Sequence, residues 1–202
     1  MADKKKMPST FFNMVMVLTV ISLVSALALG FTYSGTKSAI AQVEVKKTLK
    51  ALKKVLPEFD NTPNPNDAKY TVEVSDDPDV GAPFKTLDFY PAVKDGKSVG
   101  TAVKTYSKEA FGEPIWLMVG FDKDDKIYDI VVLKQKETPG LGTKMGDKKF
   151  KNQFKGKDPA AFKMKVTKDK GEVDAISAAT ISSRAFCDAV QRAYDALKGG
   201  KK

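Results

Sequence analysis

The stretch that decides the fold reads Asp174-Ala-Ile-Ser-Ala-Ala-Thr-Ile-Ser-Ser183, and a strongly periodic segment follows it. From Ile181 to Leu197 the apolar residues recur at intervals of three and four, which predicts an amphipathic helix ending near Gly199. Thr180 and the neighbouring hydroxyls therefore lie where this helix begins. Free backbone N–H groups and the helix dipole stabilise an anion at such a place, so a phosphate fits here, close to Arg184.

A simpler interpretation of the same segment is a helix cap. The hydroxyls of Ser177, Thr180, Ser182 and Ser183 are all of the kind that accept hydrogen bonds from the first N–H groups of a helix. Taken alone, this segment favours the cap over a ligand site.

A second segment, Glu137-Thr-Pro-Gly-Leu-Gly142, shifts the preference from a helix cap towards a ligand site when the two segments are considered together. It follows a strand-like run, and its glycines let the backbone approach a ligand because Gly140 and Gly142 tolerate positive φ. Pro139 fixes its own φ and removes a donor. Taken alone, this segment is an ordinary turn.

Together the two segments resemble the FMN-binding domain family, which includes the G subunits of Rnf ferredoxin:NAD+ oxidoreductases and the C subunits of sodium-pumping NADH:quinone oxidoreductases. In that family FMN is joined through its phosphate to a threonine hydroxyl. The family pattern around the threonine is matched by Asp174, Ser177, Ala179, Thr180 and Ser182. Ala178 departs from it, since the family usually has glycine there, and the added methyl group is expected to restrict the backbone.

The resemblance covers roughly half the chain and implies a covalent FMN at Thr180. It assigns cofactor contacts to the helix start, including Ser183, and to the second motif, which is matched by Glu137, Thr138, Pro139, Gly140, Leu141 and Gly142 and followed by Lys144. We expect this loop to lie against the flavin ring or its ribityl chain through backbone groups. For Glu137 a structural role, capping N–H groups or pairing with Lys144, is favoured over a charge effect on the flavin. Trp116 is a candidate flavin neighbour, although a core tryptophan is the better-supported interpretation.

The N-terminal part of the chain predicts a membrane anchor. Phe11 to Phe31 carries no charge, and at about 1.5 Å per residue it is long enough for a hydrocarbon core of about 30 Å. Lys4, Lys5 and Lys6 precede it, so the positive-inside rule places the N-terminus in the cytoplasm and the rest outside. A cleavable signal peptide, with Ala26-Leu-Ala28 as the cleavage pattern, is the second interpretation.

Composition excludes several function classes. Histidine is absent from the 202 residues, which rules out histidine proton relays, histidine metal ligands and histidine-dependent triads within this chain. After Phe31 there are 31 basic and 24 acidic residues, a formal charge of +7, which suits an anionic bilayer face or an acidic partner subunit. The lysines are scattered without a recognition helix, so nucleic acid is not expected. The single Cys187 is expected to be a buried, inert thiol.

Periodicity and turn residues predict an α+β fold, an antiparallel sheet with packed helices preceded by a single N-terminal transmembrane helix. The expected elements are an amphipathic helix at Ser38–Leu56, a break at Asn61–Asn66, strands at Tyr70–Ser75, Thr86–Tyr90 after Pro83, Ser98–Tyr106, Ile115–Phe121 and Ile127–Leu133, a short helix at Asp147–Phe154 capped by the aspartate, and a hairpin of Met164–Thr167 with Val173–Ile176. The expected organisation is a cytoplasmic N-terminus at 1–10, the transmembrane helix at 11–31, a connecting helix and loop at 32–66, and an extracytoplasmic FMN-binding domain at 67–202.

The resemblance implies a membrane-anchored electron-transfer subunit of an ion-translocating complex in the cytoplasmic membrane, with no independent catalytic activity. Its partners would be the other membrane and redox subunits, together with a flavin transferase that installs FMN from FAD. Three alternatives stay open at this point. They are a C-subunit-like part of a sodium-pumping NADH:quinone oxidoreductase, a flavin carrier in another extracytoplasmic reductase, and a flavin-free membrane-anchored binding module of the same fold.

Overall fold

The computed structural model of the chain describes residues 10–61, 70–73 and 84–199. The predictions at Lys4, Lys5 and Lys6, at Pro83 and over most of the Asn61–Asn66 break lie outside these residues. The chain divides into two compact units, residues 1–44 and 45–202, and each is described by itself.

Helix α1, Phe11–Val55, contains all but one of the described residues of the first unit and ends in the second. The sequence predicted a span and a separate helix from Ser38, but the structure joins them, because no proline interrupts the helix before Pro57. In the first unit this helix is long and apolar enough to cross a membrane, and its most apolar stretch is not buried in the fold. The predicted single N-terminal apolar helix is confirmed.

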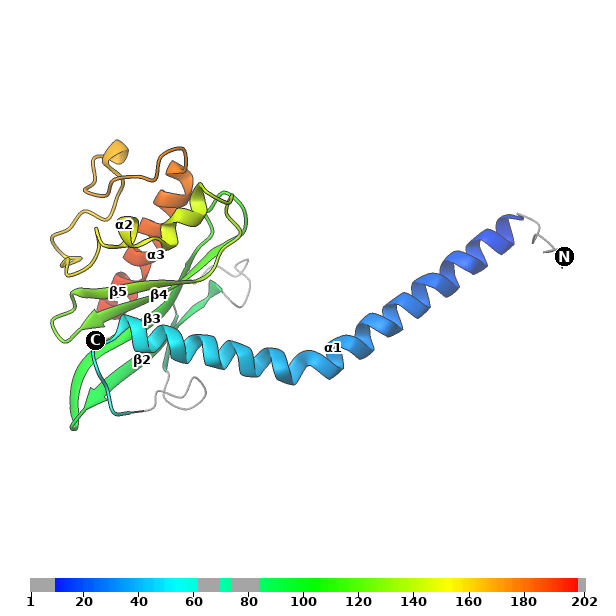
Figure 1. The fold of residues 1–202 in the computed structure, drawn as a ribbon, viewed down its shortest axis with the longest axis horizontal. Helices are drawn as coiled ribbons and strands as arrows, with labels where there is room; N and C mark the ends of the chain where they lie inside the picture. The colour runs from blue at the N-terminus through cyan, green and yellow to red at the C-terminus, as the bar shows by residue number, and fades with distance from the viewer. Residues whose placement is uncertain (1–9, 62–69, 74–83, 200–202) are drawn as a thin grey trace. The chain divides into compact units, whose positions relative to one another are not determined.

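The second unit is built on one antiparallel sheet (Figure 1). Its strands follow one another in the sheet in chain order: β1 Tyr70–Glu73, β2 Thr86–Lys94, β3 Lys97–Ser107, β4 Ile115–Asp122 and β5 Ile127–Lys134. The expected antiparallel pairing of β4 with β5 is confirmed, with Val119 opposite Ile130. The predicted α+β class is therefore correct.

Helices cover both faces of this sheet. Helix α3, Thr180–Gly199, packs mainly on β3 and β4 (Figure 1). On the other face, Leu52 and Val55 from the end of α1 pack with Tyr90 and Met118. Strand β4 is consequently buried from both sides, which explains its nearly uninterrupted run of apolar residues.

The segment between β5 and α3 is mostly irregular. It contains the short helices η2 (Gly142–Gly146), α2 (Lys148–Lys151) and η3 (Thr167–Asp169). Asp147 stands at the N-cap of α2, as predicted, but its side chain makes no capping hydrogen bond. The predicted second hairpin is wrong, since Val166 and Val173 form a single parallel bridge. The Asp169 and Gly171 amides both donate to the Val166 carbonyl and so close the tight η3 turn. After this turn the chain at Val173 runs parallel to the chain at Val166.

Candidate functional site

The site begins with the turn that starts α3. The Ala179 amide donates to the Ile176 carbonyl at 2.9 Å, and the Ser183 hydroxyl fastens this turn by accepting from the Ile176 amide and donating to the Ala179 carbonyl, each at 2.9 Å. The first helical bond runs from the Ser183 amide to Ala179. The amides of Thr180, Ile181 and Ser182 precede it and are free to face an anion. The predicted helix start at Thr180 is confirmed. Ser183 does not cap the first helical amides, since its hydroxyl accepts from Ile176, which precedes the helix.

The loop that follows β5 holds its own shape. The Leu141 amide donates to the Thr138 carbonyl at 3.1 Å, and the Gly140 amide donates to the Thr143 hydroxyl at 3.0 Å. Gly140 has a φ of +76°, which a residue with a side chain adopts only under strain. The composition of the motif therefore reflects a defined turn conformation.

A buried carboxylate joins the loop to the helix start. Glu137 is 5% exposed, and one of its oxygens accepts from the Ser182 hydroxyl while the other accepts from the Gly112 amide at 3.2 Å. Gly142 allows this approach, since a Cβ there would lie 2.5 Å from the Ser182 hydroxyl oxygen and 2.6 Å from the Glu137 carboxylate. Glu137 thus joins two motifs that are far apart in the sequence. The structural role expected for Glu137 is observed, with Gly112 and Ser182 as its hydrogen-bond partners.

A pocket of about 340 Å³ opens where the two motifs meet, and we call it the Thr180 pocket. It is formed by one residue of the β3–β4 loop, four of the Glu137 loop and five at the helix start: Phe111, Glu137, Thr138, Leu141, Gly142, Ala178, Ala179, Thr180, Ile181 and Ser182. Thr180 lines this pocket and is half-buried.

The mouth of the Thr180 pocket is apolar. Phe111 is 69% exposed, Ile181 47% and Leu141 38%. Among the described residues of the second unit, Tyr128 is the only other large hydrophobic side chain that is comparably exposed. Exposed apolar side chains gathered at one place mark a binding surface. The residues with unpaired amides and those with exposed apolar side chains line one pocket, a combination that suits a phosphate-bearing ligand with a flat apolar ring.

Ala178 adopts a left-handed conformation, with a φ of +59°. Glycine takes this conformation without cost, whereas a Cβ is strained in it. The difference from the family pattern therefore falls on a backbone position that favours glycine, next to Ala179 and Thr180.

The remaining predicted residues surround the pocket without lining it. Pro139 and Gly140 form the outer bend of the loop, and Lys144 is exposed in η2. Asp174 is held through its backbone, whose amide donates to Gln153 at 2.7 Å and whose carbonyl accepts from Gln153 at 3.2 Å. Ser177 is exposed just before the pocket-lining residues.

Trp116 belongs to a different cluster. Its ring stacks on Phe84 at 5.6 Å between centroids and lies 5.4 Å from Tyr106, whose hydroxyl donates to the Phe84 carbonyl. Burial raises the pKa of Tyr106 above its usual value. This packing matches the core interpretation, and the aromatic side chain at the pocket is Phe111. Sequence reasoning missed Phe111 because only its loop position beside Gly112 distinguishes it, and exposure cannot be read from composition.

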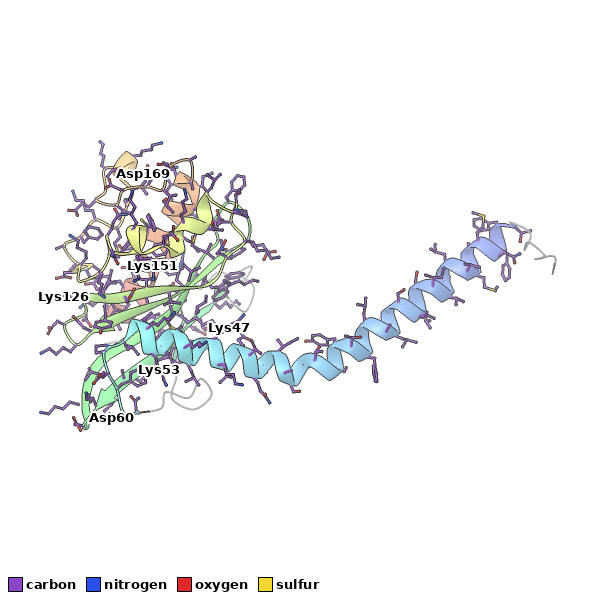
Figure 2. The ribbon with its side chains drawn as sticks, in the orientation of Figure 1. Lys47, Lys53, Asp60, Lys126, Lys151 and Asp169 are labelled. Atoms are coloured by element: carbon purple, nitrogen blue, oxygen red, sulfur yellow. The ribbon has the colours of Figure 1, made fainter. Side chains whose placement is uncertain are left out.

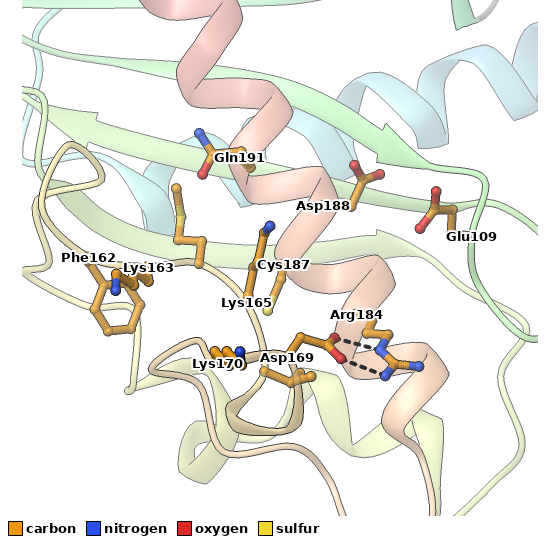
Figure 3. Close-up of a pocket in the computed structure, with 12 residues that line it drawn as sticks. Glu109, Phe162, Lys163, Lys165, Asp169, Lys170, Arg184, Cys187, Asp188 and Gln191 are labelled. Carbon is orange, nitrogen blue, oxygen red and sulfur yellow. Dashed lines mark hydrogen bonds and ion pairs between the residues drawn. The ribbon is translucent and has the colours of Figure 1, made fainter.

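A second, larger hollow of about 640 Å³ lies further along α3 (Figure 3), and we call it the Arg184 hollow. Arg184 donates two hydrogen bonds to Asp169, both at 2.7 Å, and this pair lowers the pKa of Asp169 and raises that of Arg184. The expected contribution of Arg184 to phosphate binding is thus replaced by an ion pair. Burial raises the pKa of the Cys187 thiol in the same hollow to about 12, as expected for an inert cysteine.

Comparison with known proteins identifies the family and the fold of the chain. The FMN-binding domain family matches residues 111–195, a range that contains both motifs. The G subunit of an ion-translocating oxidoreductase complex from Methanosarcina acetivorans is 34% identical, over 96% of each chain. The G subunit of the Na+-translocating ferredoxin:NAD+ oxidoreductase complex from Acetobacterium woodii is 30% identical, over 89% of this chain and 87% of that protein. The crystal structure of the C subunit of the Na+-translocating NADH-quinone reductase from Parabacteroides distasonis shares the fold, with a TM-score of 0.53 and 21% identity over 80% of this chain and 94% of that one.

Proposed function

Because this chain belongs to the family of G subunits of ion-translocating oxidoreductase complexes, we propose that it is an electron-transfer subunit that carries FMN bonded through its phosphate to the Thr180 hydroxyl. The observation that carries the proposal is the meeting of two distant motifs in one pocket that includes Thr180. FMN, when bound, accepts two electrons and can release them one at a time. The protein supplies the position of the cofactor and its surroundings.

The chain's own residues divide the binding work. The free amides of Thr180, Ile181 and Ser182 would stabilise the phosphate charge at the start of α3. Phe111 and Leu141 would lie against the flavin ring, since they are the exposed apolar side chains contributed by the two loops. Glu137 holds the loop and the helix start at a fixed separation, which keeps the pocket open before any ligand enters.

Attachment needs a second protein. In the proposed reaction the Thr180 oxygen forms a bond to the FMN phosphorus of FAD, the bond from that phosphorus to AMP breaks, and the hydroxyl proton passes to a base of the flavin transferase. Thr180 lines the pocket and is only half-buried, which gives such an enzyme access to it. A covalent bond keeps the flavin on a domain that faces open solvent.

Replacing Thr180 with valine tests the attachment, since the change is nearly isosteric and leaves the buried contacts of the helix start intact. The wild-type protein should show flavin fluorescence in a denaturing gel, and its intact mass should exceed that of the chain by one FMN. The Thr180→Val protein should lose both signals while keeping its unfolding midpoint. Absence of flavin from wild-type protein produced together with the transferase would favour the flavin-free binding module, and flavin mapped to another peptide would refute the assignment of Thr180.

We also propose that the domain faces the outside of the cell, because Lys4, Lys5 and Lys6 precede the apolar stretch of α1. Protease added to intact spheroplasts should then remove the flavin-bearing domain. Protection of the domain until the membrane is opened would reverse the orientation. The partners of the subunit in electron transfer would be the membrane and redox subunits of the same complex.

A further inference from the structure

The positive charge of the chain is concentrated in one segment. Residues 148–170 contain nine lysines and two aspartates, a formal charge of +7. This equals the formal charge of everything after Phe31, so the rest of that part of the chain is neutral. The lysines are spread along the sequence, but the net positive charge after Phe31 is confined to residues 148–170.

The structure turns this segment into a layer with a basic outer surface. Its apolar residues Phe150, Phe154, Met164 and Val166 are buried in the main core. Eight of the nine lysines are exposed, and Lys151 is the exception. We call residues 148–170 the basic layer.

Few of these charges are neutralised within the chain. Among the described residues, Lys151 is the only one of the nine within ion-pairing distance of a carboxylate, Asp129 at 3.6 Å, and it also donates to the Ile130 carbonyl at 2.6 Å. One of the two aspartates, Asp169, is already paired with Arg184. Lys163, Lys165 and Lys170 also line the Arg184 hollow (Figure 3).

The chemistry of the basic layer favours lipid headgroups over a protein surface. None of the exposed large hydrophobic side chains of the described chain lies between residues 142 and 180. Protein interfaces depend on aromatic and arginine anchors and are depleted in lysine, whereas clustered lysines attract anionic lipid headgroups. The apolar patch of the second unit lies instead at the Thr180 pocket, where a protein partner has anchors to contact.

We propose that the basic layer binds the anionic phospholipid headgroups of the membrane that α1 enters. Because α1 tethers the domain to that membrane, the lysines meet its headgroups at a raised effective concentration, and weak individual contacts add up. Through the Arg184–Asp169 pair the layer is joined to α3 one turn after Thr180, and binding therefore orients the Thr180 pocket relative to the bilayer. The inference rests on α1 as an anchor and does not depend on the flavin.

Hydrogen–deuterium exchange of the full-length protein in nanodiscs tests this binding. One set of discs contains phosphatidylcholine alone, and the other contains phosphatidylglycerol as about 30% of the lipid. Peptides covering residues 157–171 should exchange at least about threefold more slowly in the anionic discs at low salt. The difference should vanish at about 1 M salt, where the Debye length is about 3 Å.

Two matched triple variants make the test specific. Lys163→Glu, Lys165→Glu and Lys170→Glu together should abolish the protection. Lys53→Glu, Lys97→Glu and Lys123→Glu change the same charge at exposed positions of the second unit outside the basic layer and should keep it. Figure 2 shows Lys53 well away from Asp169 of the basic layer.

Several outcomes would overturn the proposal. Equal exchange in the two kinds of disc would do so, as would equal loss of protection in both triple variants. Protection that arises in phosphatidylcholine discs only when the other subunits are added would assign the layer to a protein partner. Thr180→Val protein should retain the lipid effect, so failure of the flavin proposal and failure of this one give different results.

Discussion

The Thr180 pocket and the Arg184 hollow lie along the same helix, yet they are built from opposite kinds of side chain. The Thr180 pocket has an apolar mouth and a buried carboxylate–hydroxyl bond that fixes its walls. The Arg184 hollow is nearly twice as large, but lysines and an internally satisfied ion pair surround it. Volume alone would select the Arg184 hollow over the pocket that we propose for the cofactor. A binding site is better indicated by polar groups that are held in place and lack hydrogen-bond partners, as the first amides of α3 do.

The largest expected effect comes from filling the close approach at Gly142. The Cβ of Gly142→Val would press on Ser182 and Glu137, so we expect a loss of about 2–3 kcal/mol in the free energy of unfolding and little or no bound flavin. Urea unfolding and in-gel fluorescence measure the two quantities.

Gly140→Ala is the matched control for this change. A Cβ at Gly140 meets no atom within 4 Å, so only its φ of +76° is strained, at a cost of about 1 kcal/mol, and flavin should remain attached. Equal losses of unfolding free energy and of bound flavin in the two variants would contradict the prediction. They would show that the close approach of loop and helix at Gly142 is not required.

A smaller effect is expected at the mouth of the Thr180 pocket. Phe111→Ala should change the free energy of unfolding by less than about 0.5 kcal/mol, because the ring is 69% exposed. It should nevertheless expose the flavin, so that iodide quenches its fluorescence about twofold or more faster than in wild type. Tyr128→Ala removes another exposed aromatic ring outside the pocket lining and should leave quenching unchanged. Unchanged quenching in Phe111→Ala would place the flavin ring elsewhere.

Much of the fold follows from local patterns. Three patterns each favoured a single local structure and predicted it correctly. They are the period of three and four after Thr180, the alternating strands, and the turn between β4 and β5. The predicted hairpin at Met164 failed because short β-branched runs do not fix the direction of pairing, which the η3 turn decides. The join within α1 was missed because an amphipathic pattern does not reveal where a preceding helix ends.

The site was predictable in its motifs and unpredictable in its contacts. Thr180 and the Glu137 loop could be named because their residues match the two motifs of the family. The bond between Glu137 and Ser182 and the exposure of Phe111 depend on how the loop, the helix and the β3–β4 connection pack together, and no local pattern encodes that packing. The concentration of charge in residues 148–170 was present in the sequence but became a surface only when its apolar residues were seen to be buried.

A stabilising effect is expected at Ala178, where the chain departs from its family. Left-handed backbone costs a residue with a Cβ about 1–2 kcal/mol, while glycine adds about 0.5–1 kcal/mol of entropy loss on folding. The first effect is the larger at a φ of +59°, so Ala178→Gly should raise the free energy of unfolding by about 0.5–1 kcal/mol and shift the urea midpoint upward.

The neighbouring residue provides the control for this last comparison. Ala179 is buried and does not have a positive φ, so Ala179→Gly should lower the free energy of unfolding by about 1 kcal/mol. If the strain at Ala178 also hinders access to the Thr180 hydroxyl, Ala178→Gly should load flavin faster than wild type in a time course with the transferase and FAD. A loss of stability in Ala178→Gly would mean that residue 178 is not held in the left-handed region, and the pocket would then have to be built on a different turn before α3.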